Sequence, residues 1–144
     1  MPVQEAVERA LQTHARSGWI GGQGEVPGSD NPEMPAVLRI VTALVRSKPN
    51  MSFSVAQIAA AARMSPNHFS SLFKKYQGVS FSEFLTARRI EMAKEVLCDL
   101  TLNVTEASGR VGYDDPGYFA RRFKQATGMT PREWRAKVTH PAGS

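Results

Sequence analysis

A segment of this chain occurs twice, and the repeat constrains the fold more than any other feature. Residues 69–78 read FSSLFKKYQG, and residues 119–128 read FARRFKQATG. Identical residues recur at an offset of 50, namely Pro66/Pro116, Phe69/Phe119, Phe73/Phe123, Lys74/Lys124, Gly78/Gly128 and Glu83/Glu133. Upstream of the prolines the offset falls to 49, so we expect a turn one residue longer in the second copy. These identities in register indicate one supersecondary unit that is used twice.

Helical periodicity dominates the chain outside a Gly/Pro-rich segment that follows Gly18. Apolar residues recur three and four positions apart, and no run shows the sustained alternation of a half-buried strand. Ser65-Pro66 and Asp115-Pro116 each place a capping residue before a proline at the first helical position. We therefore expect an all-α protein of about seven helices. They include an amphipathic helix over 3–17, a short helix capped by Ser54, and a longer helix over about 82–99 opened by Ser82.

Each copy of the repeat reads as a short helix, a tight turn and a second helix. This is the helix-turn-helix layout, in which the second helix enters the DNA major groove. In the second helices, Phe69 and Phe73, and likewise Phe119 and Phe123, are expected to dock inward and leave the opposite face exposed. The alternative is a plain helical bundle whose solvated faces carry these polar residues.

The charge is divided unevenly along the chain. Residues 1–35 hold two basic and five acidic residues, whereas 36–144 hold sixteen basic and eight acidic ones, so the net charges are −3 and +8. A basic domain of this kind favours a polyanionic partner such as nucleic acid. We expect residues 1–35 not to contact DNA.

At this level of detail residues 36–137 resemble the C-terminal DNA-binding domain of AraC/XylS transcription regulators. The resemblance rests on GYDDPGYFARRFKQATGMTPREWR at 112–135 and on AAAARMSPNHFSSLFKKYQGVSFSEFLTARRIEMAKEVL at 59–97. The wording is most similar to members fused to receiver or sensor domains. The resemblance implies two helix-turn-helix subdomains, at about 54–76 and 104–126, joined by the linker helix at 82–99. The domain would then span 36–138, behind an N-terminal helix and linker at 1–35 and before a tail at 139–144.

The implied function is a transcription regulator, expected to be an activator, that reads two adjacent major grooves of double-stranded DNA. RNA polymerase is a second candidate partner. The residues expected to read bases are Asn67, Ser70, Ser71, Gly117, Tyr118, Arg121 and Arg122. The residues expected to contact phosphates are His68, Lys74, Lys75, Arg88 and Lys124.

Several residues depart from the family pattern. Ser71 stands where members usually carry arginine, which removes one bidentate guanine contact. Ala107 and Ser108 replace a usual Ile-Ala pair, so we expect looser packing in the second subdomain. Asp114 and Asp115 add negative charge to its turn. A degenerate helix-turn-helix module that binds a protein instead of DNA is therefore the alternative function.

Other classes of function receive little support. The three histidines are scattered and the single cysteine, Cys98, lacks metal-ligand spacing, so we expect no enzyme, metal or cofactor. Cys98 lies in an apolar helical stretch and is expected to be a buried structural thiol. No run approaches the roughly 18 apolar residues of a membrane span, and a secretory signal is lacking, so the expected location is the cytoplasm. No small-molecule site is evident, and a stand-alone regulator and a fragment of a longer one both remain open.

Overall fold

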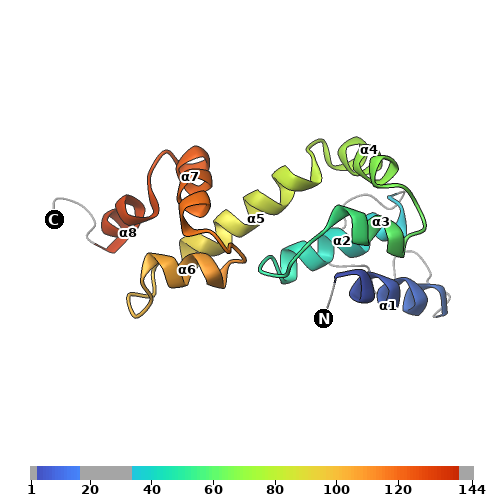
Figure 1. Cartoon of the computed structure of the whole chain (residues 1–144), viewed down its shortest axis with the longest axis horizontal. Coiled ribbons are helices and arrows are strands. Elements are labelled where there is room, and N and C mark those ends of the chain that lie inside the picture. Colours follow the sequence, from blue (N-terminus) through green and yellow to red (C-terminus); the bar gives the residue numbers. More distant parts are fainter. Residues whose placement is uncertain (1–2, 17–33, 140–144) are drawn as a thin grey trace. The chain divides into compact units, whose positions relative to one another are not determined.

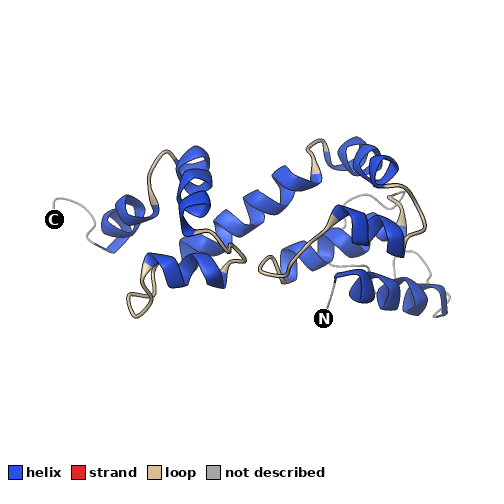
Figure 2. Cartoon of the chain, viewed as in Figure 1, coloured by secondary structure: helices blue, strands red, loops and turns tan. Residues whose placement is uncertain are grey.

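The computed structural model describes residues 3–16 and 34–139, and within them it contains eight helices and no strand (Figures 1 and 2). The prediction of an all-α protein is confirmed. The helices are α1 (Val3–Arg16), α2 (Ala36–Ser47), α3 (Val55–Ala61), α4 (Pro66–Gln77), α5 (Phe81–Val96), α6 (Val104–Arg110), α7 (Pro116–Thr127) and α8 (Pro131–Thr139). The helix that the sequence reading did not anticipate is α8, which follows α7 as α5 follows α4.

The chain divides into two compact units, with the boundary after Phe84. Unit 1 contains α1 to α4 and the first turn of α5, and unit 2 contains the rest of α5 with α6 to α8. Each unit holds one copy of the repeat, α3–α4 or α6–α7. The connection between the two helices runs over 62–65 in unit 1 and over 111–115 in unit 2. The expectation of a longer second turn is therefore confirmed.

In unit 1, the N-terminal helix packs directly on the helix-turn-helix. Helix α1 contacts both α2 and α3, and its Val3 and Val7 are completely buried. In the structure this helix forms part of the unit 1 core.

Aromatic side chains fix α4 within unit 1. Phe69 and Phe73 are fully buried on α4. Both rings contact the ring of Phe81, at centroid distances of 6.0 and 5.4 Å, and Phe73 also meets Phe84 at 5.4 Å. Edge-to-face aromatic pairs at these distances are favourable. The first turn of α5 therefore anchors the inner face of α4.

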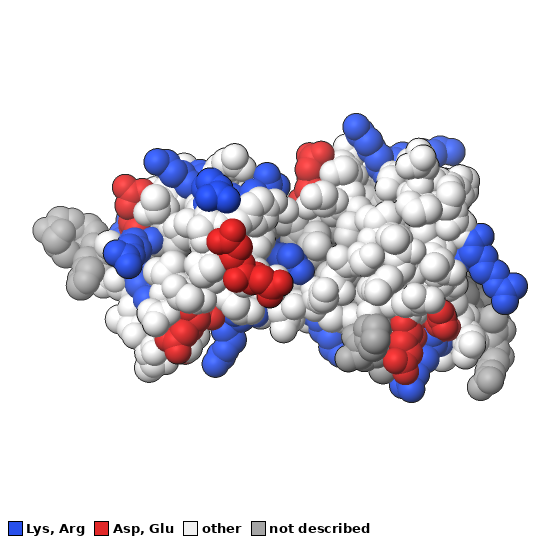
Figure 3. All heavy atoms as spheres, in the orientation of Figure 1, with Lys and Arg blue, Asp and Glu red and all other residues white. Residues whose placement is uncertain are grey.

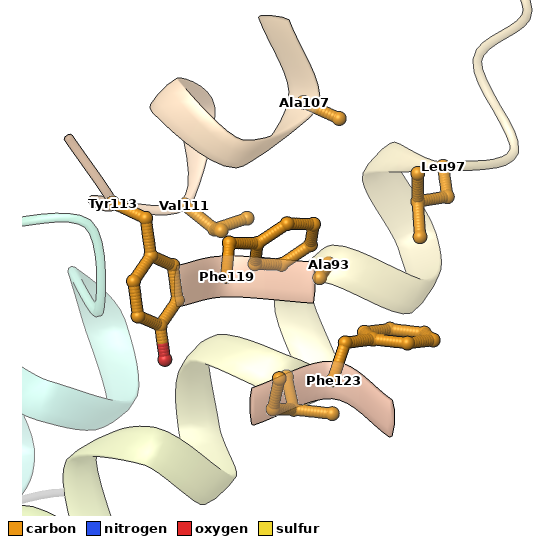
Figure 4. Close-up of a cluster of buried hydrophobic side chains, with 8 residues drawn as sticks. Ala93, Leu97, Ala107, Val111, Tyr113, Phe119 and Phe123 are labelled. Atoms are coloured by element: carbon orange, nitrogen blue, oxygen red, sulfur yellow. The ribbon is translucent and has the colours of Figure 1, made fainter. Parts of the chain in front are cut away.

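The core of unit 2 is built in the same way around Phe119 and Phe123 of α7 (Figure 4). These rings pack with residues of α5, the turn after α5, α6 and the turn between α6 and α7, namely Ile90, Ala93, Leu97, Ala107, Val111 and Tyr113. Trp134 of α8 meets Phe123 edge-on at a centroid distance of 6.1 Å. Trp134 is half-buried and packs against this cluster.

The predicted caps open the two exposed helices. The Ser65 hydroxyl accepts a hydrogen bond from His68 N at 3.0 Å. The Asp115 carboxylate accepts from Gly117 N at 2.9 Å and from Tyr118 N at 3.3 Å. A proline occupies the first turn of both α4 and α7. Asp115 therefore serves as a helix cap as well as a surface charge.

Two details of α5 differ from the sequence reading. Its cap is Ser80 and not Ser82, because the Ser80 hydroxyl accepts a hydrogen bond from Glu83 N at 3.1 Å. The helix also ends at Val96 and not near 99. Cys98 consequently lies in a turn and is exposed, which corrects the expectation of a buried thiol. Leu97 fills the core at this turn instead.

The small residues of α6 are accommodated without an unsatisfied hydroxyl. Ala107 and Ser108 are both buried, and Ser108 Oγ donates to Thr105 O at 2.8 Å. Helix α6 also begins with a capping box, in which Asn103 and Glu106 each bond the backbone N–H of the other. The hydroxyl that the sequence placed near the core is thus hydrogen-bonded within its own helix.

Candidate nucleic-acid interface

The outer face of α4 carries the residues predicted for the first reading helix. Phe69 and Phe73 turn inward, and the residues on the other sides of the helix are exposed, namely Asn67, His68, Ser70, Ser71, Lys74 and Lys75. Four of these, from Ser70 to Lys75, line an open groove with Val55 at the start of α3 and with Ser80, Phe81 and Ser82 at the start of α5. The groove combines hydroxyl groups with two ammonium groups, a composition suited to a phosphate backbone.

Helix α7 exposes the predicted residues Gly117, Tyr118, Arg121 and Lys124, together with Gln125 and Ala126. The Arg121 guanidinium carbon lies 5.9 Å from the centre of the Tyr118 ring. Arginine offers the paired donors that match guanine O6 and N7 in the major groove. Of the exposed residues described on α4 and α7, Arg121 has the side chain best suited to direct base readout.

Arg122 does not lie on the exposed face where the sequence reading placed it. Its side chain is half-buried, with Nη2 3.3 Å from Thr86 Oγ1 on α5 and Nη1 3.1 Å from Gln125 Oε1. The repeat explains the difference, because Arg122 takes the position of Leu72, which is also half-buried against its own unit. Arg122 therefore ties α7 to α5 within unit 2.

The two arginines of α5 are also partly buried in unit 2 and not fully exposed. Arg88 and Arg89 are both half-buried. The Arg89 guanidinium lies over the Tyr113 ring, 5.3 Å from its centre. Burial lowers the pKa of Arg89 and raises that of Tyr113. Nearby on α5, Glu91 pairs with Lys94 at 3.2 Å.

Basic side chains gather over the surface formed by α7 (Figure 3). The last turn of α4 holds Lys74 and Lys75, and that of α7 holds Lys124. In both helices the basic residues follow an inward-facing phenylalanine, so the docking pattern of the repeat sets where the positive charge is exposed. Each unit can thus present one helix with a basic end to a polyanion.

Neither a metal site nor a membrane-spanning helix is found among the described residues. In 3–16 and 34–139 no group of three or more His, Cys, Asp or Glu residues could hold a metal ion. Over the same ranges, no helix has the length and apolar character needed to cross a membrane.

The comparison with known proteins agrees with this geometry. A family model described as a helix-turn-helix domain matches residues 58–137. The chain is 32% identical over 135 residues to a putative AraC-like transcription regulator of Streptomyces lividans, with 94% of this chain and 40% of that protein covered. The chain therefore belongs to the AraC family of helix-turn-helix transcription regulators. This family is not one of enzymes, as the sequence led us to expect.

Solved structures of the same architecture cover most of the chain. The C-terminal domain of AraT, a response regulator from Geobacillus stearothermophilus, is 30% identical, with a TM-score of 0.65 over 72% of this chain and 86% of that one. The DNA-binding domain of AdpA, in complex with a target DNA, is 25% identical, with a TM-score of 0.62 over 74% and 97%. The chain spans less than half the length of the curated relatives it matches.

Proposed function

We propose that this protein binds double-stranded DNA sequence-specifically and regulates transcription, as an activator. The observation that supports this most directly is the presence of two capped helices, α4 and α7. Each is docked by a buried phenylalanine pair and each exposes a basic last turn. The likeness to the AdpA domain that was solved with its target DNA supports the same assignment.

In this proposal α4 and α7 enter adjacent major grooves, and RNA polymerase is the partner through which activation occurs. One chain should then protect close to two helical turns of DNA. A footprint of one groove per chain, with two chains needed for each site, would contradict the proposal of two reading helices in one protein.

The residues divide into readers and anchors. Arg121 is exposed on α7, and Ser71 holds the matching position on α4, so Arg121 should carry most of the direct base discrimination. A bidentate arginine–guanine pair contributes about 1–3 kcal/mol of discrimination. Lys74 and Lys124 should instead contact phosphates, which contribute to affinity for any sequence. Asn67, Ser70 and Gly117 would be secondary base contacts, and His68, Lys75 and Arg88 further phosphate contacts.

Titration of a selected duplex and a scrambled duplex at several salt concentrations tests this division. The selected duplex is one that the wild-type chain enriches from a random library. Arg121→Ala should lower affinity for the selected duplex about 5- to 150-fold and leave the scrambled duplex nearly unchanged. Lys74→Ala and Lys124→Ala should weaken both duplexes and lower the salt slope by about 1 each.

The alternative, a module that binds a protein partner, gives a different result in the same titration. Ser71 and the exposed Asp114 are the residues that favour it. In that case affinity for duplex would be weak and show no selected sequence. If Arg121→Ala instead lowers affinity for both duplexes equally, the protein still binds DNA, but Arg121 is a phosphate anchor and not a base reader.

A further inference from the structure

We propose that Tyr118 is a positioning residue that holds the Arg121 guanidinium ready for base reading, and that its own ring is backed by Tyr113 and Arg89. This inference rests on the proposed function. It assigns Tyr118 to the support of Arg121, in place of the direct base contact expected from the sequence.

The support is a continuous series of ring and guanidinium contacts within unit 2, called the stack below, in which the two tyrosine rings are tilted by 52° to each other. Arg121 lies over the Tyr118 ring at 5.9 Å, and the Tyr118 and Tyr113 ring centres are 6.0 Å apart. Tyr113 in turn lies under the Arg89 guanidinium at 5.3 Å. Tyr113 is buried, whereas Tyr118 is 46% exposed. The stack therefore runs from the core of the unit to its exposed helix, with Arg121 at the outer end.

The start of α7 leaves room for this arrangement. A Cβ built on Gly117 would lie 3.6 Å from Arg121 Nη1 and 3.3 Å from Asp115 Oδ1. The guanidinium thus lies beside the bare backbone of Gly117, and a side chain larger than a methyl group would compete with it for the same space. The absence of a side chain at Gly117 therefore leaves the space that the Arg121 guanidinium occupies.

The first copy of the repeat lacks every outer component of the stack. At an offset of 50, Asn67 stands for Gly117, His68 for Tyr118 and Ser71 for Arg121. The arginine and the tyrosine that supports it are therefore present together in one copy and absent together from the other. This joint occurrence is expected if the tyrosine ring positions the arginine, because a ring that contacted DNA directly could do so without an arginine beside it.

A cation–π contact at an exposed site has a strength that corresponds to about a two- to fivefold effect on an equilibrium. Tyr118→Leu, which removes the ring, should lower affinity for the selected duplex about two- to fivefold and leave the scrambled duplex unchanged. Tyr118→Phe, which keeps the ring and removes the hydroxyl, is the matched control and should behave as wild type. In an Arg121→Ala background, Tyr118→Leu should have no further effect on either duplex.

A second measurement tests the stack in the protein without DNA. The side-chain protons of Arg121 should show an upfield ring-current shift in NMR spectra that persists in Tyr118→Phe and disappears in Tyr118→Leu. Absence of that shift in the wild type would overturn the stack, whatever the DNA titration gives. Equal loss in the two Tyr118 variants, or additive losses with Arg121→Ala, would instead make Tyr118 a direct DNA contact. A wild-type chain with the shift but no preferred duplex would overturn the reading role together with the proposed function, and leave the stack as a structural feature.

Discussion

Replacing Val7 by alanine tests whether α1 is an integral part of unit 1. Val7 is 0% exposed on α1, and α1 packs against α2 and α3. The substitution removes two methyl groups, each of which contributes about 0.8 kcal/mol when it is buried. The cavity left behind adds to this loss, so the free energy of unfolding should fall by about 2 kcal/mol. That is a large fraction of the stability of a small domain.

Urea unfolding followed by circular dichroism measures the change, and hydrogen exchange shows where it occurs. Protection should fall in α2 and α3 and persist in α6 to α8, because the buried cluster of unit 2 contains no residue of α1. Gln12→Ala is the matched control, since Gln12 is an exposed position of the same helix. It should change the free energy of unfolding by less than about 0.5 kcal/mol.

Affinity for DNA, measured where all variants are folded, should be the same in the wild type and in both variants. This retains the sequence-based expectation that residues 1–35 do not contact DNA. If Val7→Ala is no more destabilising than Gln12→Ala, then α1 is not part of the cooperative core of unit 1. If protection is lost equally in α6 to α8, the two units do not unfold separately and the reasoning from their separate cores fails.

Two further substitutions probe unit 2. Gly112→Ala should lower the free energy of unfolding by about 1–3 kcal/mol, because Gly112 has a φ of +98° and an added Cβ would lie 3.1 Å from the Arg89 guanidinium. Gly109→Ala is the control, since Gly109 is a helical position with open space around it. In thermal unfolding, the melting temperature should fall in Gly112→Ala and not in Gly109→Ala. Glu133→Gln tests a pH dependence, since the hydrogen bond from the backbone N–H of Thr130 lowers the pKa of Glu133 below its ordinary value. A carboxyl group whose pKa is lowered by folding stabilises the folded state at pH values above its pKa in the unfolded chain. This stabilisation is lost as the pH falls through its pKa in the folded state. Wild type should therefore have the higher melting temperature near neutral pH and lose that advantage in acid.

The repeat made the backbone of this fold predictable because its signals are local. A capping side chain, a proline in the first turn and a left-handed glycine each act within a few residues of their own position. Ser65, Asp115, Gly78 and Gly128 accordingly have the structural roles expected of helix ends. Comparing the two copies of the repeat could also have identified Ser80 as the cap of α5. Ser80 aligns with Thr130 at an offset of 50, and each of the two residues lies three positions before a glutamate.

The arrangement of the interface was less predictable because it depends on contacts between distant residues. Periodicity places Arg122 beside Arg121, and nothing nearby in the sequence says that its guanidinium meets Thr86, 36 positions away. One signal was present, because Arg122 aligns with Leu72, and the repeat position of a packed leucine faces inward. Likewise, the pattern of α1 showed an apolar face but not which helices would cover it.

The two copies of the repeat agree at the phenylalanines that dock each second helix and differ at the positions between those phenylalanines. Phe69 and Phe73 have identical counterparts in Phe119 and Phe123, and all four are fully buried. The exposed residues between these phenylalanines differ, as in Ser71 on α4 and Arg121 on α7. Because the shared phenylalanines dock both helices, the outer face of either helix can change while the helix keeps its place. On the proposed function, α4 then supplies mainly affinity through its lysines, and α7 supplies discrimination through its one supported arginine.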